Sequence, residues 1–296
     1  MWIWMVACVG SRTSMTTTPS STTSPGVRWV VGRSSYFDGV LVLSDRRTGE
    51  VVGKVRGLDG AQTVVTGPDG RWVACAELQN RIVWIDPATL EIDGSLVEDD
   101  PATEADETGG LIHPDAAIFG PDGRLYVSSF GTDEVLRYEP DGTFVDVFVG
   151  AREGGLQGPD LGLVFDAEGR FHVPGWTSDA VHRYDADGSY LGDLLTASDG
   201  LDRPRVVAFD HEGRAYVTSR GNGAVLRREL DGTVTRWIER PNVTGMVLDE
   251  DAGQLLLAND EDGRVEVRDL ASGELLDTWG PKVDGATALS LLPMPL

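Results

Sequence analysis

His113 and Asp115 are the residues whose types and spacing most directly suggest acid–base chemistry in this chain. They flank Pro114 in a His-Pro-Asp sequence, and a histidine close to a carboxylate can act as a general base with a shifted pKa. The same tripeptide is also an ordinary turn that leads into a strand, and no nucleophile is evidently paired with it. His113 is therefore a catalytic candidate only if the chain is an enzyme.

Other catalytic signals are weaker. The sequence contains no Gly-x-Ser-x-Gly, no His-Glu-x-x-His and no phosphate-cradling glycine loop. His172 and His182 fall within strand-like patterns and His211 within a turn, so we interpret all three as structural or solvated.

The composition excludes several partners. The 296 residues include 25 basic and 48 acidic side chains, which gives a formal net charge of −23. No basic stripe is present to neutralise phosphates, so we expect neither a nucleic-acid partner nor binding to an anionic lipid surface. Cys8 and Cys75 are the two cysteines, too few for a disulfide framework or a zinc site. We expect no cofactor, and a monomer.

Residues 1–27 look like a signal segment followed by a tether. A short apolar run ends in Met5-Val6-Ala7-Cys8 and is followed by a Ser/Thr/Pro-rich tract too polar to pack. This start resembles a truncated bacterial lipoprotein signal, in which Cys8 would be lipidated, although Met5 stands where leucine is usual and a basic start is missing. We therefore expect an extracytoplasmic protein, lipid-anchored or secreted; the alternative is a disordered tail on a cytoplasmic protein. No other stretch has the roughly 18 apolar residues of a membrane span.

Two hairpins recur through the rest of the chain. One, with an Asp-Gly-like turn and apolar alternation on both sides, has six copies, at residues 40–57, 82–98, 135–150, 181–195, 225–239 and 265–280. Their equivalent turn positions, Gly49, Leu90, Gly142, Gly188, Gly232 and Gly273, are 41, 52, 46, 44 and 41 residues apart. The other hairpin has five complete copies, at residues 63–77, 116–130, 162–176, 206–220 and 245–259. Spacings of this length suit four short strands for each repeat.

The hairpin with five complete copies has a sixth copy that is split between the chain ends. Residues 28–33 supply one of its strands and residues from Gly285 onward supply the other. Pairing the two ends in one sheet would close a ring and remove exposed sheet edges. The sequence therefore predicts an all-β, six-bladed β-propeller over residues 28–296, with four antiparallel strands per blade and one blade completed by the C-terminal strand.

The repeated phrases resemble those of NHL-repeat propellers, within the superfamily that includes gluconolactonase, regucalcin and strictosidine-synthase-like proteins. Gly-Pro-Asp-Gly-Arg begins at residues 67 and 120, and Val-Leu-Arg-Tyr-Glu-Pro-Asp-Gly spans 135–142. The resemblance covers roughly residues 28–293. It implies architecture more than activity, because these phrases form turns and strands rather than a site.

Strand order predicts which end of the ring can bind. The loops that precede the first strand of each blade and those between its second and third strands share one end. Aligning the innermost strands places Gln62, Asp115, Leu161, Arg205, Thr244 and Ala286 at the inner mouth, with Phe130, Trp176 and Arg220 among the residues that crown it. We predict that a small molecule or a protein binds at this mouth. The predicted binding residues are Gln62, Asp115, Arg205, Thr244, Phe130, Trp176 and Arg220.

The resemblance also implies an alternative function, a divalent-metal-dependent lactonase, hydrolase or lyase of the gluconolactonase type. Asp115, Asp160 and Asn242 would then hold Ca²⁺, Zn²⁺ or Mn²⁺, and His113 would be the base. Asp160 and Asn242 would reach the mouth only through a bulge in their blades. Against this, Arg205 would repel a cation, and an Asp115–Arg205 pair would be satisfied without a ligand.

An acidic insertion lies between the second and third blades. It runs from Glu98 to Gly110 and accounts for the 52-residue spacing. It lacks the regular ligand spacing of a calcium loop, so we expect a solvated lid over the mouth.

Overall fold

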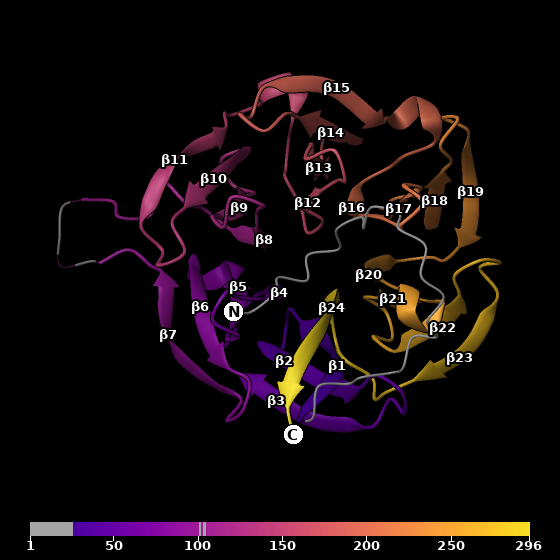
Figure 1. Cartoon of the computed structure of the whole chain (residues 1–296), viewed down its shortest axis with the longest axis horizontal. Coiled ribbons are helices and arrows are strands. Elements are labelled where there is room, and N and C mark those ends of the chain that lie inside the picture. The colour runs from indigo at the N-terminus through magenta and orange to yellow at the C-terminus, as the bar shows by residue number, and fades with distance from the viewer. Residues whose placement is uncertain (1–25, 101, 103–104) are drawn as a thin grey trace, which may run out of the picture.

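The computed structural model describes residues 26–296 except 101, 103 and 104, so Cys8 and all but the last two residues of the predicted signal and tether lie outside the described residues. Within the described part, six four-stranded antiparallel sheets stand around a central axis (Figure 1). This is the predicted six-bladed β-propeller. No helix among the described residues has the length and apolar character needed to cross a membrane.

Every blade runs from an inner strand at the channel to an outer strand at the rim. Blade 1 contains β24 (Ala286–Pro295), β1 (Val27–Ser35), β2 (Val40–Asp45) and β3 (Val51–Arg56). Blade 2 contains β4 (Ala61–Thr66), β5 (Trp72–Ala76), β6 (Arg81–Asp86) and β7 (Glu91–Val97). Blade 3 contains β8 (Pro114–Phe119), β9 (Leu125–Ser129), β10 (Glu134–Tyr138) and β11 (Phe144–Val149).

The other three blades follow the same order. Blade 4 contains β12 (Val164–Phe165), β13 (Phe171–Gly175), β14 (Ala180–Tyr184) and β15 (Tyr190–Leu195). Blade 5 contains β16 (Pro204–Phe209), β17 (Ala215–Ser219), β18 (Ala224–Arg228) and β19 (Val234–Glu239). Blade 6 contains β20 (Val243–Asp249), β21 (Gln254–Asn259), β22 (Val265–Asp269) and β23 (Leu275–Trp279). Short 3-10 turns are η1 (Glu77–Gln79), η2 (Glu153–Gly155), η3 (Ala197–Asp199) and η4 (Glu250–Ala252).

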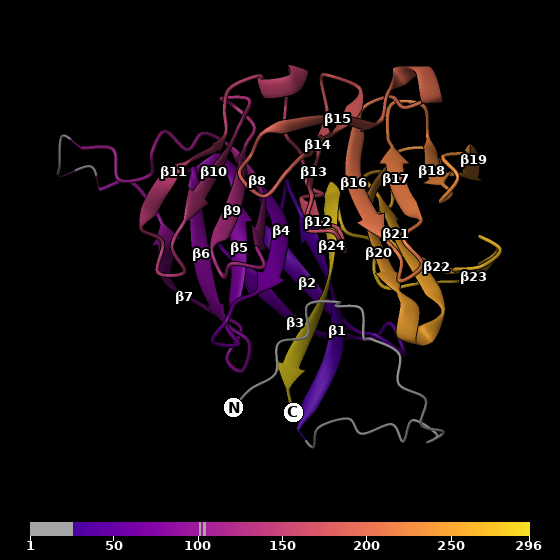
Figure 2. The same ribbon diagram turned by 45° about the horizontal axis from the view of Figure 1, so that its top comes forward.

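The chain ends close the ring as predicted. β24 pairs antiparallel with β1, from Val27 opposite Pro295 to Ser35 opposite Ala286. The two strands lie side by side in both views, yellow against indigo (Figures 1 and 2). This pairing joins residues at opposite ends of the sequence, so the ring has no open blade edge at the junction.

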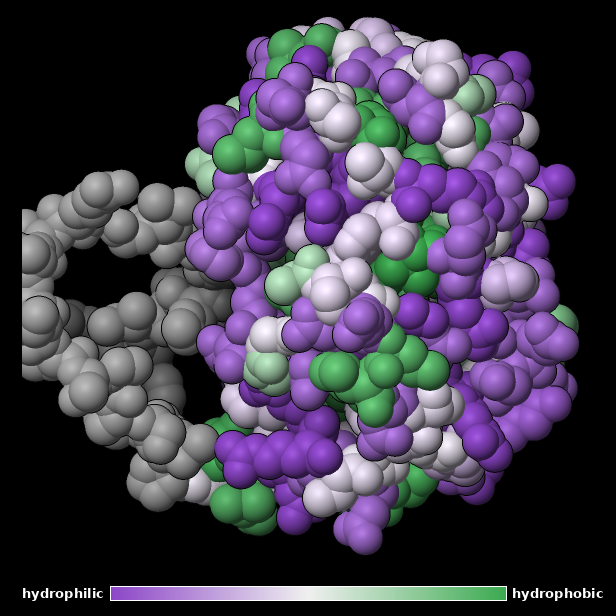
Figure 3. All heavy atoms as spheres, turned by 90° about the vertical axis from the view of Figure 1, so that its right-hand side faces the viewer, coloured by the Kyte–Doolittle hydropathy of each residue, from purple (hydrophilic) through white to green (hydrophobic). Residues whose placement is uncertain are grey.

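The core lies between blades rather than in one centre. Six apolar clusters each join neighbouring blades; one, for example, packs Leu43 and Leu292 of blade 1 against Trp72 and Ile85 of blade 2. Hydrophilic residues cover most of the side formed by the outer strands of blades 5 and 6 (Figure 3). Burial between blades fixes the angular position of each blade, and with it the residues at the channel mouth.

The acidic insertion does not cover the mouth. Its described parts extend outward from the ring beyond β7 and β11 (Figure 1), and none of its described residues lines the channel pocket. Thr108 is anchored to blade 3, where the Tyr138 hydroxyl donates to its carbonyl oxygen over 2.8 Å. The prediction of a lid over the mouth was therefore wrong.

Candidate functional site

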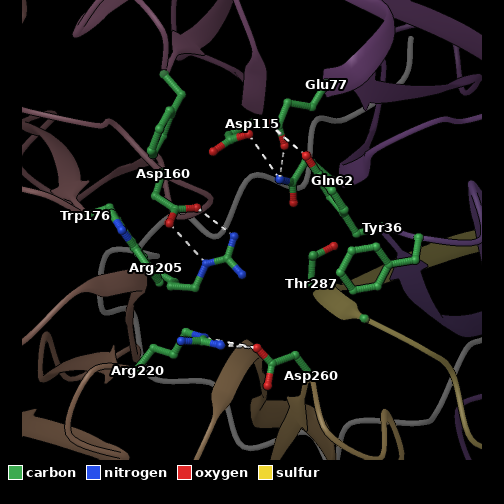
Figure 4. A pocket seen from close by; sticks show the side chains of 13 residues that line it. Tyr36, Gln62, Glu77, Asp115, Asp160, Trp176, Arg205, Arg220, Asp260 and Thr287 are labelled. Atoms are coloured by element: carbon green, nitrogen blue, oxygen red, sulfur yellow. Dashed lines mark hydrogen bonds and ion pairs between the residues drawn. The ribbon is translucent and has the colours of Figure 1, made fainter.

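A pocket of about 380 Å³ opens at the end of the channel where the inner strands begin. All six blades contribute to it, through the first residues of inner strands and the loops between second and third strands (Figure 4). Its lining residues are Tyr36, Phe37, Gln62, Glu77, Asp115, Phe130, Asp160, Trp176, Arg205, Arg220, Asp260, Gly285 and Thr287.

One side of the pocket is a network of buried acceptors around Gln62. The Gln62 amide nitrogen donates to Glu77 Oε2 over 2.6 Å and to Asp115 Oδ1 over 3.1 Å. The Tyr36 hydroxyl donates to Glu77 Oε1 over 3.3 Å. Because both amide hydrogens face carboxylates, the amide oxygen must point the other way, and it has no hydrogen-bond partner although it is buried.

Asp115 carries a strongly perturbed carboxyl group. Burial, followed by the nearby carboxylates of Asp160 and Glu77, raises the pKa of Asp115 well above its usual range. Arg205 opposes this shift but does not overcome it. The pocket therefore favours a protonated Asp115 when nothing else supplies positive charge.

Arg205 and Asp160 form a buried bidentate ion pair. Arg205 Nε donates to Asp160 Oδ2 over 3.0 Å, and Nη2 donates to Oδ1 over 3.1 Å. Burial alone would lower the pKa of Arg205, but the facing carboxylate more than offsets this and raises it. The predicted Asp115–Arg205 pair was wrong, because Arg205 hydrogen-bonds to Asp160 instead.

An irregular inner strand in blade 4 explains this exchange of partners. β12 has only two residues, and Pro159 forms an isolated bridge with Gly175 before the strand begins. The Asp160 backbone N–H donates to Pro174, and its side chain accepts from the N–H of Leu161. Asp160 is thus held at the mouth, while Leu161 is buried.

Arginines surround Trp176 on the opposite side of the pocket. The guanidinium carbons of Arg203, Arg205 and Arg220 lie 5.8, 5.5 and 5.6 Å from the centre of its ring. Arg220 is itself paired with Asp260 through both Nε and Nη2. The indole is therefore fixed in place by cations that are neutralised by their own carboxylates.

The structure brings most of the predicted binding residues together. Gln62, Asp115, Phe130, Trp176, Arg205 and Arg220 all line the pocket. Thr244 does not, because it is buried and donates to the Ala286 carbonyl over 2.7 Å. At the end of the chain, Thr287 lines the pocket where the alignment placed Ala286. His113 is exposed and is not among the lining residues, although its Nδ1 lies 3.6 Å from Glu77 Oε1.

Six lining residues were not among the predicted site residues: Tyr36, Phe37, Glu77, Asp260, Gly285 and Thr287. Glu77 follows β5 in the predicted crown, and only the structure shows that η1 buries its carboxylate. Tyr36 and Phe37 follow β1 in the split blade, where half of the repeat pattern is missing. Their position after a second strand, equivalent to Phe130, is the signal that would have identified them.

The donor set does not fit the predicted metal site. Both oxygens of Asp160 are occupied by Arg205, which would place a guanidinium beside the cation. Asn242 is not a lining residue. The described residues contain no group of three or more His, Cys, Asp or Glu side chains arranged to hold a metal ion.

Fold and site together define a six-bladed β-propeller with a pocket of aromatic and charged side chains at its channel mouth. No protein-family model matches the sequence, and no curated protein matches it. Among solved structures, a chain of the nidogen–laminin complex aligns with a TM-score of 0.70 at 16% identity, covering 89% of this chain and 98% of that one. A protein of unknown function from Bacteroides caccae aligns with a TM-score of 0.64 at 15% identity, covering 90% and 99%. A streptogramin B lyase aligns with a TM-score of 0.54 at 14% identity, covering 89% and 80%. At these identities the similarity shows the fold alone.

Proposed function

We propose that this protein is an extracytoplasmic binding propeller whose ligand occupies the pocket at the channel mouth. One observation carries the proposal: all six blades converge on a pocket that combines aromatic walls with a buried, unpartnered amide oxygen. A buried polar atom without a partner is costly in a finished core but is expected where a ligand completes the hydrogen bond.

The state of the charged groups supports binding rather than catalysis. Arg205 and Arg220 are each neutralised by a carboxylate, and His113 lies outside the pocket lining. A reaction would have to use Glu77 or Asp115, the lining carboxyl groups without an arginine partner, and no Ser, Cys, Lys or His side chain among the described residues lines the pocket to act beside them. The solved neighbours include both a complex of nidogen with laminin and a lyase, so the fold itself permits either use.

We also propose lipidation at Cys8 and an NHL-type origin for the repeats. Support comes from the Met5–Cys8 sequence before a Ser/Thr/Pro tract and from the recurring Gly-Pro-Asp-Gly-Arg phrase. Mass spectrometry of the protein expressed from its full sequence in a bacterium tests the first point. A diacylglycerol adduct should be present on Cys8 and lost in Cys8→Ser.

The binding proposal is tested with a panel of small molecules that contains equal numbers of cations, neutral compounds and anions. Ligand-observed NMR should detect binders, and Trp176→Ala or Phe130→Ala, which truncate lining rings, should weaken their binding while the fold, followed by circular dichroism, is retained. If no member of the panel binds in a manner that depends on either ring, the proposed function is wrong for ligands of this size.

A further inference from the structure

The pocket has more acidic than basic side chains. Four carboxyl groups line it, those of Glu77, Asp115, Asp160 and Asp260, against the guanidinium groups of Arg205 and Arg220. The two ion pairs account for Asp160 and Asp260. Glu77 and Asp115 are left bonded to one Gln62 nitrogen, without an arginine or lysine of the described residues bonded to either; the exposed His113, outside the pocket lining, lies 3.6 Å from Glu77. Their side of the pocket therefore has more carboxyl groups than basic groups.

The unpartnered oxygen belongs to the same Gln62 amide group whose nitrogen is bonded to both carboxyl groups. Gln62 is 3% exposed, and Figure 4 shows its amide nitrogen bonded to both carboxyl groups while the amide oxygen is left free. The carboxylates fix this orientation, because the opposite one would turn the oxygen toward them. The pocket thus offers one neutral and two acidic acceptors, which call for a group with several N–H donors and a positive charge.

Aromatic rings line the same pocket. Tyr36, Phe37 and Phe130 line the pocket, and the Tyr36 hydroxyl is itself bonded to Glu77. Such rings attract an organic cation through their faces and pack against its methylene groups. A hydrated metal ion would gain neither contact.

We propose that the mouth binds the primary ammonium group of an organic amine, held by Glu77, Asp115 and the side-chain oxygen of Gln62. The inference rests on the proposed binding function and names its ligand class. An ammonium group has three donors and one charge, so it matches three acceptors and replaces the missing basic side chain. The rings of Tyr36 and Phe130 would surround its carbon chain.

The experiment compares three four-carbon probes of similar size: n-butylammonium, butan-1-ol and butyrate. Calorimetric titration at pH 8 should detect binding of n-butylammonium, at least tenfold tighter than either of the others. Ca²⁺, Mn²⁺ and Zn²⁺ chlorides are titrated separately. If a metal ion binds at the mouth and excludes n-butylammonium, or if the neutral or anionic probe binds equally well, the inference is overturned.

Variants locate the binding. Glu77→Gln retains the shape and the acceptor but removes the charge, and it should weaken n-butylammonium about 10- to 100-fold, as expected for the loss of a charge-assisted hydrogen bond. Glu168→Gln removes an exposed carboxylate from the turn at the opposite end of the ring and should change nothing. Equal loss in both variants would mean non-specific attraction to the acidic surface and would overturn the inference.

Failure of the inference can be told from failure of the proposed function. Neutral or anionic members of the broader panel whose binding depends on Trp176 or Phe130 would leave the binding function standing and reject the amine. Absence of any binder would reject both. Should Glu77→Gln fail to fold, Asp115→Asn provides the second test, since it removes the other carboxyl group while keeping an acceptor for Gln62, and it should weaken n-butylammonium and leave butan-1-ol unaffected.

Discussion

At the scale of single residues, the pocket makes ionisation of the Asp115 carboxyl group unfavourable. Its folded-state pKa lies above the unfolded value of about 3.9, because burial and the Asp160 and Glu77 carboxylates outweigh Arg205. The neutral carboxyl group therefore contributes stability that is complete below pH 3.9 and is lost as the pH rises through the folded pKa. A protein that keeps such a residue in its core loses stability at neutral pH, as is common at binding sites.

Asp115→Asn is expected to stabilise the fold at pH 8 and to change it little at pH 4. The Asn amide oxygen can still accept from Gln62, and its nitrogen can donate to Glu77. The gain in unfolding free energy should be about 1.4 kcal/mol for each unit by which the Asp115 pKa is raised. Urea titrations at both pH values measure it. The same variant should lose affinity for n-butylammonium.

Asp141→Asn is the control for this prediction. Asp141 is exposed on a turn, where the backbone N–H and the side chain of Thr143 lower its pKa. Its substitution should therefore reduce stability at pH 8, the opposite sign. If Asp115→Asn also reduces stability at pH 8, the carboxyl group is ionised and well accommodated, and our account of its burial is wrong.

The contacts of one buried histidine resemble those of a catalytic triad, with Ser178 on one side of His182 and Asp193 on the other. We nevertheless expect Ser178 to be unreactive. Ser178 Oγ lies 2.8 Å from His182 Nε2, and His182 Nδ1 lies 2.8 Å from Asp193 Oδ1. The second contact is not aligned as a hydrogen bond, and burial lowers the pKa of His182, which makes it a weak base. A fluorophosphonate should leave the intact mass unchanged, with trypsin as a positive control. An adduct that disappears in Ser178→Ala would contradict this.

The sequence predicted several of the residues that lie at the channel mouth, but it did not predict all of the contacts between them. Gln62, Asp115 and Arg205 were found because each opens an inner strand, and strand order fixes where those residues lie. The partner of Arg205 could not be found in this way, because it depends on the irregular path before β12. A one-residue difference at β24 similarly placed Thr287, not Ala286, at the pocket.

At the scale of elements, the turn between the third and fourth strands of each blade contains one residue with a left-handed backbone. All six equivalent positions have positive φ, including Leu90 at +61° in place of glycine. The alignment of these turns from sequence was therefore correct even where the residue type departs from the pattern. Several of them also touch the preceding blade: a Cβ at Gly188 would collide with the carbonyl oxygen of Phe148.

Gly188→Ala should destabilise the protein more than Gly70→Ala. Both glycines have φ +89°, but a Cβ at Gly70 meets no atom within 4 Å. Gly70→Ala should cost about 1–2 kcal/mol for the left-handed backbone alone. Gly188→Ala should cost about 1–3 kcal/mol more, because blades 3 and 4 must separate. Chemical denaturation measures both, and equal losses would show that this turn does not fix the spacing of the blades.

At the scale of the whole molecule, we expect closure of the ring by β24 and β1 to make the six blades unfold together. The sequence predicted this closure because the one incomplete repeat was split between the two chain ends, and β24 and β1 do pair. What repetition could not predict is the outward course of the acidic insertion, which occurs once and has no equivalent in the other blades. The repeats thus determine the six-bladed architecture, whereas the residues that do not repeat determine the contacts at the channel mouth.

Leu292→Ala in β24 should therefore destabilise every blade. Leu292 is 1% exposed and packs in the cluster that joins blades 1 and 2, so its truncation should cost about 2–5 kcal/mol. Leu276→Ala, on the exposed outer strand β23, should cost less than about 0.5 kcal/mol. Because loss of the closing strand opens the ring, far-UV circular dichroism and tryptophan fluorescence should show one shared, lowered transition. Two separate transitions would mean that blade 1 melts alone, and that the two joined ends do not hold the ring together.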